Sequence, residues 1–393
     1  MKIGRVLRVV KDNSREEIFN CSKEKRTIIM SIFYPAEEQY CSGDGILYKD
    51  LFQPHTELFI EDVGNTKETE EYINKLRTDV FLNVPIKNAL DKYPVIIYSP
   101  GIFQDRDFAI FTAVNIVKEG YIVITLGSLY ETDYTIMPDG DIIRVTGKLQ
   151  KEMMSSITDE TWRQLRDIRK RDMLFMVDHV FNINEKDELL KDRIDINSIG
   201  AMGFSLGAQS TFEATADDKR IKAAVLLDGS FDKSTVLEKV DNGERCSTPV
   251  LLFKSHASSY DLKVKQAKCF YENIEDKKKA EELINEAIIE KREMIKAQKA
   301  LYQYLDGYKS FVKIQYTDHA AFCDIPVVLN LKYSECFGGK ILSRKVHEIV
   351  SITSLKFFNE FLRHRDMEYE NFIENKNNYA ELKKINAIGE VIK

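Results

Sequence analysis

Short apolar runs that end in turn residues recur along the chain from residue 93 onward. Each run is only a few residues long, and its apolar positions do not alternate with polar ones. Such runs are typical of strands that are covered on both faces, as in a mostly parallel sheet. The runs are YPVIIYSPG (93–101), GYIVITLGS (120–128), SIGAMGFS (198–205), IKAAVLLDGS (221–230), TPVLLFKS (248–255) and FVKIQYTDH (311–319).

Patterns typical of amphipathic helices lie between these runs. In residues 162–181, apolar side chains recur at the spacing of one helix face, as at Leu165 and Ile168. Helical patterns also cover residues 108–118 and 206–216. An alternation of buried strands and helices predicts a doubly wound α/β fold, in which ligands bind beyond the carboxyl ends of the strands.

The N-terminal part of the chain has a different pattern. Residues 3–10 and 26–33 are rich in β-branched and aromatic side chains and are separated by a polar segment, which predicts an antiparallel pair of strands. Residues 37–92 show no clear period, and we expect loops and short helices there, over one end of the sheet. Residues 1–92 are therefore predicted to form a strand pair with irregular cover.

One long segment interrupts the alternation before the last predicted core strand. Residues 262–309 carry dense mixed charge, and apolar side chains from Ala280 to Leu301 follow helical spacing. Glu275 and Lys279 form a favourable i,i+4 pair. A solvated helical excursion packed on the domain is one interpretation of this segment, and a lid over the substrate mouth is the other.

Composition and charge exclude several functional classes. The chain has 393 residues, of which 44% are hydrophobic, and no apolar run approaches the roughly 20 residues that a membrane span needs. The net charge of −6, without a basic stripe, argues against nucleic acid as a partner. Neither G-x-G-x-x-G nor G-x-x-x-x-G-K-[ST] occurs. We therefore expect no cofactor, no nucleic-acid partner and no integral membrane segment.

The cysteines and the first residues of the chain bear on location. Six cysteines are scattered without C-x-x-C spacing, which favours reduced thiols over a disulfide framework or a zinc site. Residues 1–17 contain no long apolar stretch that ends in small residues. A cytoplasmic protein without a metal site is therefore expected.

The segment GFSLG, residues 203–207, has the G-x-S-x-G pattern of a nucleophile elbow, in which a serine occupies a strained turn between a buried strand and a helix. The flanking glycines relieve crowding where the backbone doubles back. The apolar run before Ser205 predicts the strand, and residues 206–216 predict the helix. Ser205 is the candidate nucleophile, and an ordinary serine in a glycine-rich loop is the alternative.

A nucleophilic serine needs a histidine as general base and a carboxylate that orients this histidine. Asp228 ends the predicted strand that follows the elbow, and Asp232 is the alternative acid in the same loop. Among the six histidines, His256 and His319 directly follow predicted strands. In the hydrolase order of serine, acid and histidine, the base follows the final strand, which favours His319 over His256.

An oxyanion site is the remaining requirement. The backbone N–H of Leu206, directly after the nucleophile, is one candidate donor. The segment YSPGIF, residues 98–103, offers the other, because Gly101 lets the chain pass closely and the N–H of Ile102 would point inward. A tight Pro-Gly turn without a catalytic role is the alternative for this segment.

These motifs and their order resemble the platelet-activating factor acetylhydrolase family of the α/β-hydrolase superfamily. The resemblance is carried by DNSREEIF, RTIIMSIFYPAEE, YPVIIYSPGIF, EGYIVITLGS, MPDG, RDMLFMVDHV, GFSLGAQS, IKAAVLLDGS and DHAAFCDIP. It implies a catalytic triad of Ser205, Asp228 and His319, with Ile102 as an oxyanion donor. It also implies an α/β-hydrolase fold over residues 1–393, with a mostly parallel sheet, an antiparallel N-terminal pair and a helical insertion.

Two positions depart from the family pattern and bear on substrate choice. Pro100 stands where many members have a histidine before the glycine, and Phe204 occupies an elbow position that is often histidine. Phe103, Phe204 and Phe322 are candidate apolar walls of the substrate pocket. Aromatic packing in the core is the alternative explanation for each of the three.

The sequence therefore predicts a serine esterase that cleaves carboxylic esters through an acyl-enzyme. The resemblance implies short acyl groups, such as the acetyl group of a phospholipid or of a small soluble ester, with a role in lipid degradation and transient contact with a lipid surface. One alternative is another acyl hydrolase of the same fold, namely a thioesterase, a peptidase or a dienelactone-type hydrolase. The other is an inactive binding protein with this fold. The oligomeric state is left open.

Overall fold

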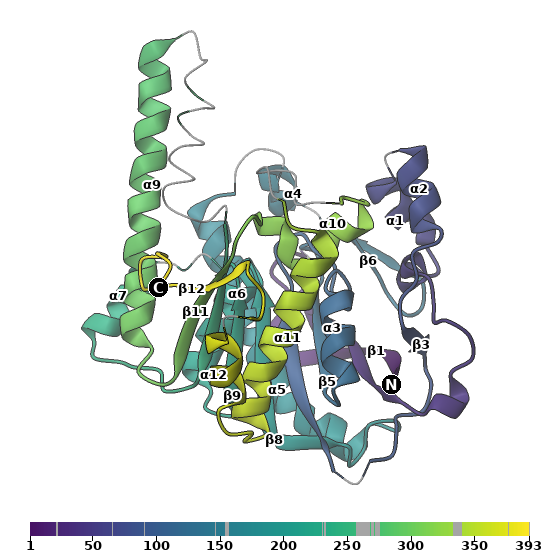
Figure 1. The fold of residues 1–393 in the computed structure, drawn as a ribbon. Coiled ribbons are helices and arrows are strands. Elements are labelled where there is room, and N and C mark those ends of the chain that lie inside the picture. The colour runs from purple at the N-terminus through teal and green to yellow at the C-terminus, as the bar shows by residue number, and fades with distance from the viewer. Residues whose placement is uncertain are drawn as a thin grey trace.

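A computed structural model describes residues 1–20, 23–64, 66–89, 91–145, 147–153, 157–229, 231, 233–256, 268, 271, 276–332, 340–375 and 377–392. A ten-stranded sheet, in the order β12-β11-β10-β9-β8-β4-β5-β2-β1-β3, forms its centre (Figure 1). The strands are β1 Lys2–Glu16, β2 Lys25–Ala36, β3 Val80–Leu82, β4 Tyr93–Ser99, β5 Ile122–Ser128, β8 Ile194–Phe204, β9 Ile221–Leu227, β10 Val250–Ser255, β11 Lys309–Ile314 and β12 Leu382–Lys384.

The pairing of the strands confirms the predicted sheet. The strands from β5 to β11 in the sheet order, namely β5, β4, β8, β9, β10 and β11, run parallel to one another. β2 pairs antiparallel with both β1 and β5, and β12 pairs antiparallel with β11. β3 pairs in parallel with β1 at the sheet edge, in a region where the sequence predicts only loops and short helices. A separate hairpin joins β6 (Tyr134–Ile136) and β7 (Ile142–Arg144).

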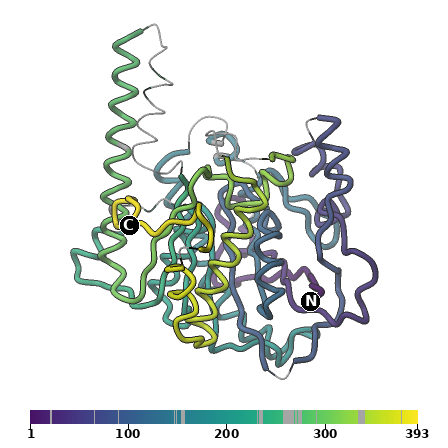
Figure 2. Tube along the Cα trace, in the orientation of Figure 1, coloured from purple at the N-terminus to yellow at the C-terminus, as the bar shows by residue number. Residues whose placement is uncertain are grey.

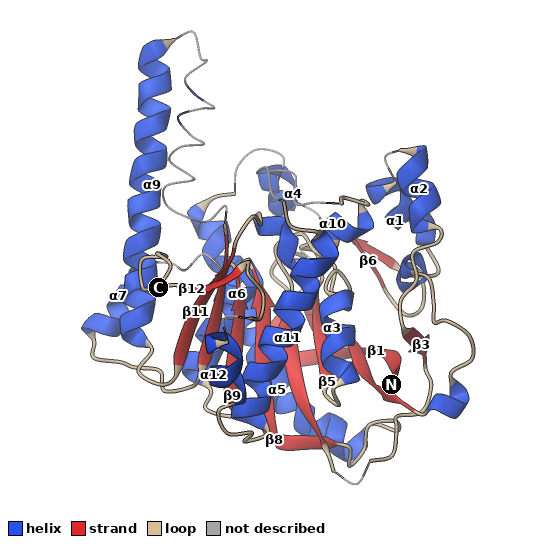
Figure 3. Ribbon diagram, in the orientation of Figure 1, coloured by secondary structure: helices blue, strands red, loops and turns tan. Residues whose placement is uncertain are grey.

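Helices cover both faces of the sheet (Figure 3). α3 (Ile110–Lys118) and α11 (Ser343–Leu362) pack on one face, and α5 (Asp159–Lys186) and α6 (Leu206–Asp217) pack on the other. The other described α-helices are α1 Thr56–Val63, α2 Lys67–Ile73, α4 Gly147–Met153, α7 Lys233–Asp241, α9 Lys277–Tyr304, α10 Ile325–Val328 and α12 Glu368–Glu374. None of the helices in the described ranges is long and apolar enough to cross a membrane.

Two of the apolar clusters, which lie on opposite faces of the sheet, explain why the central strands read as continuous apolar runs. Along β4, Ile96 and Tyr98 belong to the core beneath α3 and α11. Val95 and Ile97 belong to the core beneath α5. Because successive side chains of a strand point to opposite faces, a strand covered on both sides is apolar at every position. Because helices cover both faces, the ends of the central strands are the positions at which side chains can reach a substrate.

The insertion before β11 contains one long helix. α9 lies within the predicted segment 262–309 and packs against α7. Figure 2 shows that the beginning of α9 projects beyond the other described parts of the chain. Residues 262–267, 269–270 and 272–275 of the predicted insertion lie outside the described residues. The lid function, like the single domain over residues 1–393, stays a prediction.

Candidate active site

Ser205 occupies a strained turn between β8 and α6. Its φ of 56° and ψ of −119° lie outside the regions that residues with side chains usually adopt. A Cβ atom on Gly207 would overlap the carbonyl oxygens of Ser99 and Pro100, and one on Gly203 would overlap the backbone of Gly207. Both glycines are therefore required by close packing, as the G-x-S-x-G pattern predicts.

Ser205, His319 and Asp228 form a hydrogen-bonded chain at the carboxyl edge of the sheet. Ser205 Oγ lies 2.9 Å from Nε2 of His319, and Nδ1 of His319 lies 2.8 Å from Oδ2 of Asp228. The three residues follow β8, β11 and β9. Because parallel strands end at one edge of the sheet, side chains 114 positions apart meet there. The structure thus brings together the three side chains that the sequence pattern singles out.

Asp228 is buried and is held in its charged form. The ammonium group of Lys254 lies 3.3 Å from Oδ1 of Asp228, and the backbone N–H of Ser255 donates to the same oxygen over 3.0 Å. Burial raises the pKa of Asp228, but the charge of Lys254, the bond and charge of His319 and the N–H of Ser255 outweigh burial and hold this pKa well below its usual range. The carboxylate beside His319 is therefore ionised, as an orienting acid requires.

His256, the alternative base, packs against an aromatic ring. His256 follows β10, and its ring stacks on Tyr316 with the ring centroids 5.6 Å apart. The hydroxyl of Ser205 is bonded to His319, so the geometry favours His319. Asp232 lies outside the described residues.

Ile102 and Leu206, the candidate oxyanion donors, lie after two neighbouring strands. β4 and β8 pair in register at their ends, where Ser99 lies opposite Gly203. Leu206 is the first residue of α6, where the N–H groups of a helix have no acceptor within the helix. The side chains of Ile102 and Leu206 pack in one small apolar cluster. Ile102 thus packs near Leu206, the residue directly after Ser205, and the role of the two N–H groups as oxyanion donors stays a prediction.

The three phenylalanines proposed as pocket walls have different surroundings. The ring of Phe204 is buried, with its centroid 4.8 Å from that of His319. Phe103 is half-buried, in the loop after β4, with a φ of 61°. Phe322 is buried and packs edge-on against Phe253, with the ring centroids 6.2 Å apart. Phe204 and Phe322 both belong to the core beneath α3 and α11, and the role of all three rings as pocket walls stays a prediction.

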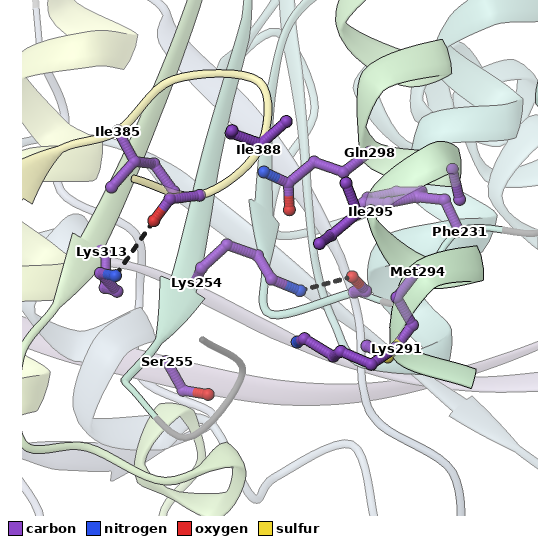
Figure 4. Close-up of a pocket in the computed structure, with 13 residues that line it drawn as sticks. Phe231, Lys254, Ser255, Lys291, Met294, Ile295, Gln298, Lys313, Ile385 and Ile388 are labelled. Atoms are coloured by element: carbon purple, nitrogen blue, oxygen red, sulfur yellow. Dashed lines mark hydrogen bonds between the residues drawn. The ribbon is translucent and has the colours of Figure 1, made fainter. Parts of the chain in front are cut away.

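Lys254 is a candidate site residue that the sequence reasoning missed. Its Nζ donates to the carbonyl oxygen of Gly229 over 3.1 Å, in addition to its ion pair with Asp228. Its side chain lies in a cavity that Lys291 and Lys313 also line (Figure 4). The signal in the sequence is a charged residue inside the apolar run TPVLLFKS, because a buried lysine is rare unless it is paired.

Asp324 is a second missed residue. Its buried Oδ2 accepts a hydrogen bond from the N–H of Ile110 over 2.7 Å and another from the hydroxyl of Tyr48 over 3.1 Å. Ile110 begins α3, so Asp324 ties the segment after His319 to that helix. Burial raises the pKa of Asp324 to about 7, against the lowering effect of these hydrogen bonds. The spacing of Asp324 from His319 in DHAAFCDIP was the available signal.

The fold and this site together define the class of protein. A mostly parallel sheet that carries a serine elbow, then an acid, then a histidine at the ends of its strands is the α/β-hydrolase fold. The fold class predicted from the sequence is therefore confirmed.

Two family models match parts of the chain. The platelet-activating factor acetylhydrolase, isoform II, family matches residues 17–128, and the PET hydrolase-like family matches residues 148–304. The resemblance to the platelet-activating factor acetylhydrolase family, inferred from the order of the motifs, is therefore confirmed. The second match contains both the elbow and Asp228.

Curated relatives agree with the first of these families. The chain is 21% identical to platelet-activating factor acetylhydrolase of Canis lupus familiaris over 238 residues, which are 51% of this chain and 49% of the relative. It is 25% identical to the probable 1-alkyl-2-acetylglycerophosphocholine esterase of Arthroderma benhamiae over 242 residues, 58% of this chain and 57% of the relative. The chain thus spans about half the length of these relatives.

A solved structure is similar over nearly the whole chain. The ferulic acid esterase from Streptomyces cinnamoneus superposes with a TM-score of 0.70 and 19% sequence identity, covering 98% of this chain and 96% of that one. The likeness shows the same fold.

Proposed function

We propose that this protein is a serine hydrolase that cleaves carboxylic esters through an acyl-enzyme. The observation that carries the proposal is the chain of hydrogen bonds from Ser205 through His319 to Asp228, at 2.9 and 2.8 Å. Distances in this range are those at which a base can accept the proton of a nucleophile. The strained turn at Ser205 and the low pKa of Asp228 add support.

The reaction divides into two halves that use the same groups. In the first half, Ser205 Oγ attacks the ester carbonyl carbon while His319 Nε2 accepts the hydroxyl proton. The bond to the leaving alcohol then breaks, and the alcohol takes that proton from His319. In the second half, water attacks the acyl group with His319 again as base, the carboxylic acid leaves, and Ser205 recovers its proton. Asp228 keeps the imidazole oriented and stabilises its charged form.

The N–H groups of Ile102 and Leu206 are the proposed donors to the oxyanion. A tetrahedral intermediate carries its negative charge on the former carbonyl oxygen. Donors that are already in place lower the energy of this intermediate, because they need no reorganisation during the reaction. The position of Leu206 at the start of α6 adds the positive end of a helix dipole. The loop after β4 and the first turn of α6 would thus both stabilise the negative charge of the oxyanion.

Short-chain acyl esters are the proposed substrates, with acetylated phospholipid-like molecules as the first class to test. The support comes from the curated relatives, one named as a platelet-activating factor acetylhydrolase and one as a probable 1-alkyl-2-acetylglycerophosphocholine esterase. Phe103 and Phe204 would form apolar walls near the reacting carbonyl. Contact with a lipid surface, a cytoplasmic location and a lid function for residues 262–309 are further predictions.

Hydrolysis of p-nitrophenyl acetate and butyrate by the wild type and by Ser205→Ala tests the proposal. We expect turnover by the wild type, a preference for the acetyl ester, loss of turnover in Ser205→Ala, and labelling of the wild type alone by a fluorophosphonate. Turnover that survives in Ser205→Ala would refute Ser205 as the nucleophile. A wild type that shows neither turnover nor labelling would favour a binding protein with this fold, and a thioester substrate in the panel separates esterase from thioesterase.

A further inference from the structure

A buried guanidinium group lies behind the loop that carries Ile102. Arg169 projects from α5 and is 1% exposed. Its Nη1 donates to the carbonyl oxygens of Pro100 and Gly101, the latter over 3.2 Å. We propose that Arg169 is a positioning residue for the oxyanion hole, which orients the N–H of Ile102 by holding the carbonyl of the same peptide group. This inference rests on the proposed esterase function.

The geometry of the peptide bond is the first step of the argument. The carbonyl of Gly101 and the N–H of Ile102 belong to one planar group, and in a trans peptide they point in opposite directions. A donor that holds the Gly101 oxygen therefore also sets the direction of the Ile102 N–H. A cation on the carbonyl side also polarises the peptide, which makes its N–H a stronger donor to a developing oxyanion.

A second set of contacts, made within the loop itself, also holds Gly101. The N–H of Gln104 donates to the Gly101 oxygen, and the N–H of Gly101 donates to Oε1 of Gln104, both over 3.3 Å. A Cβ atom on Gly101 would come within 2.9 Å of the ring of Phe204. The loop thus packs against the residue that precedes Ser205, and Arg169 holds its carbonyl oxygens.

The charge of Arg169 is embedded in a buried ion network. Nε of Arg169 lies 2.8 Å from Oε2 of Glu131, and Glu131 also contacts Arg26 at 3.4 Å. Arg26 in turn pairs with Asp172 at 2.6 Å and with Glu17 at 2.7 Å. Because burying ion pairs is costly and seldom stabilises a fold on balance, a network with one member on the oxyanion loop points to a functional constraint.

Arg26 supplies the matched control. Arg26 and Arg169 are both buried and both pair with Glu131. Within the described part of the chain, however, the side chain of Arg26 donates to carboxylates of the network, namely those of Glu17, Glu131 and Asp172, and not to the loop. Arg26→Met and Arg169→Met should therefore lower thermal stability in a similar way. Only Arg169→Met removes the guanidinium group that holds the peptide before Ile102.

The test measures kcat and KM for p-nitrophenyl acetate, the inhibition constant of an alkyl boronic acid, and Tm. A boronic acid that bonds to a serine becomes a tetrahedral anion, so its affinity reports the oxyanion site. For Arg169→Met we expect kcat to fall about 100-fold, KM to change less than about 3-fold, and the inhibition constant to rise with the fall in kcat. For Arg26→Met we expect kcat and inhibition within about 5-fold of the wild type at a similarly lowered Tm.

The opposite outcomes are equally clear. Equal losses of kcat and inhibitor affinity in both variants, or no loss in Arg169→Met, would overturn the positioning role. If Arg169→Met does not fold, the double variant Arg169→Met/Glu131→Gln removes the ion pair as a unit, and Glu131→Gln alone is its control. The same comparison of kcat and inhibition then decides the question.

Failure of the proposed function would look different. A wild type that neither hydrolyses the ester nor reacts with a fluorophosphonate would refute the esterase and, with it, the role of Arg169. An active wild type with an Arg169→Met variant that behaves like Arg26→Met would refute the positioning role alone.

Discussion

The ammonium group of Lys254 lies 3.3 Å from Oδ1 of Asp228, the carboxylate oxygen that His319 does not contact. This buried carboxylate therefore lies between the Lys254 ammonium group on one side and the His319 imidazole on the other. Lys254 stabilises the ionised acid and at the same time weakens the attraction that Asp228 exerts on a protonated His319.

Replacement of Lys254 by methionine is expected to change the pH dependence of the reaction. Without the cation, the full charge of Asp228 favours the protonated imidazole, which cannot act as a base. As the pH falls, activity should therefore be lost at a higher pH than in the wild type. The acidic limb of the kcat/KM profile should move up by about 0.5 to 1 pH unit.

Lys313→Met is the control for that measurement. Lys313 lies opposite Lys254 in the pairing of β10 with β11 and lines the same cavity, but its Nζ donates to the carbonyl oxygen of Gly389. An equal displacement of the profile in both variants, or none in Lys254→Met, would contradict a direct action of Lys254 on Asp228.

Asp228→Asn is expected to lower kcat by about 10³ to 10⁴, with a small change in KM. An asparagine cannot supply the charge that stabilises the imidazolium, and its amide group can hold His319 in the wrong tautomer. Steady-state kinetics with p-nitrophenyl acetate measures the loss. The companion variant Asp232→Asn should stay within about 3-fold of the wild type, and equal effects at both positions would refute Asp228 as the acid.

Phe322 is expected to contribute to the stability of the fold, whereas Phe103 is expected to contribute to substrate binding. Phe322→Ala opens a cavity beside Phe253 and should lower the free energy of unfolding by about 3 to 5 kcal/mol, as urea denaturation would measure. Phe103→Ala should change the free energy of unfolding by less than about 1 kcal/mol and raise KM for the butyryl ester several-fold. A large loss of stability in Phe103→Ala, with KM unchanged, would place that ring in the core.

Asp324 is expected to make stability depend on pH. Its pKa is about 7 in the folded protein and near 4 in an unfolded chain, so the folded state binds the proton more tightly. The stabilising contribution of the protonated group is complete below the unfolded pKa and is lost as pH rises toward 7.

Comparison with Asp324→Asn isolates this effect. Relative to this variant, the wild type should lose roughly 2 to 4 kcal/mol of unfolding free energy between pH 4 and pH 8. Asp218→Asn is the contrasting case, because the hydrogen bond from Arg220 lowers the pKa of Asp218 and gives the opposite sign. A constant difference between wild type and Asp324→Asn across this range would show that Asp324 is ionised throughout.

The strands and the site triad could be predicted because their signals are local. Each central strand contains a short continuous apolar run, and Ser205, Asp228 and His319 follow such runs. β3 was missed because three residues at a sheet edge are too few to show a period. The short helices between β2 and β4 likewise have boundaries that depend on the packing of neighbouring segments.

Arg169 and Lys254 could not be assigned roles because their partners are distant in the sequence. A helical arginine is ordinarily a solvated residue, and nothing near Arg169 in the chain indicates that it faces Pro100 and Glu131. The contacts arise only when α5, β4 and the segment after β5 are brought together by the sheet. Buried ion pairs of this kind are a property of the folded chain rather than of any one motif.

The pairing of β10 with β11 is continuous from Val250 to Ser255, although their connection contains the whole of α9. The ladder of hydrogen bonds, and not the length of the connecting chain, sets where His319 emerges. The projecting beginning of α9 is therefore modular: natural variation or deliberate exchange could shorten, lengthen or replace it while the catalytic geometry at the strand tips is preserved.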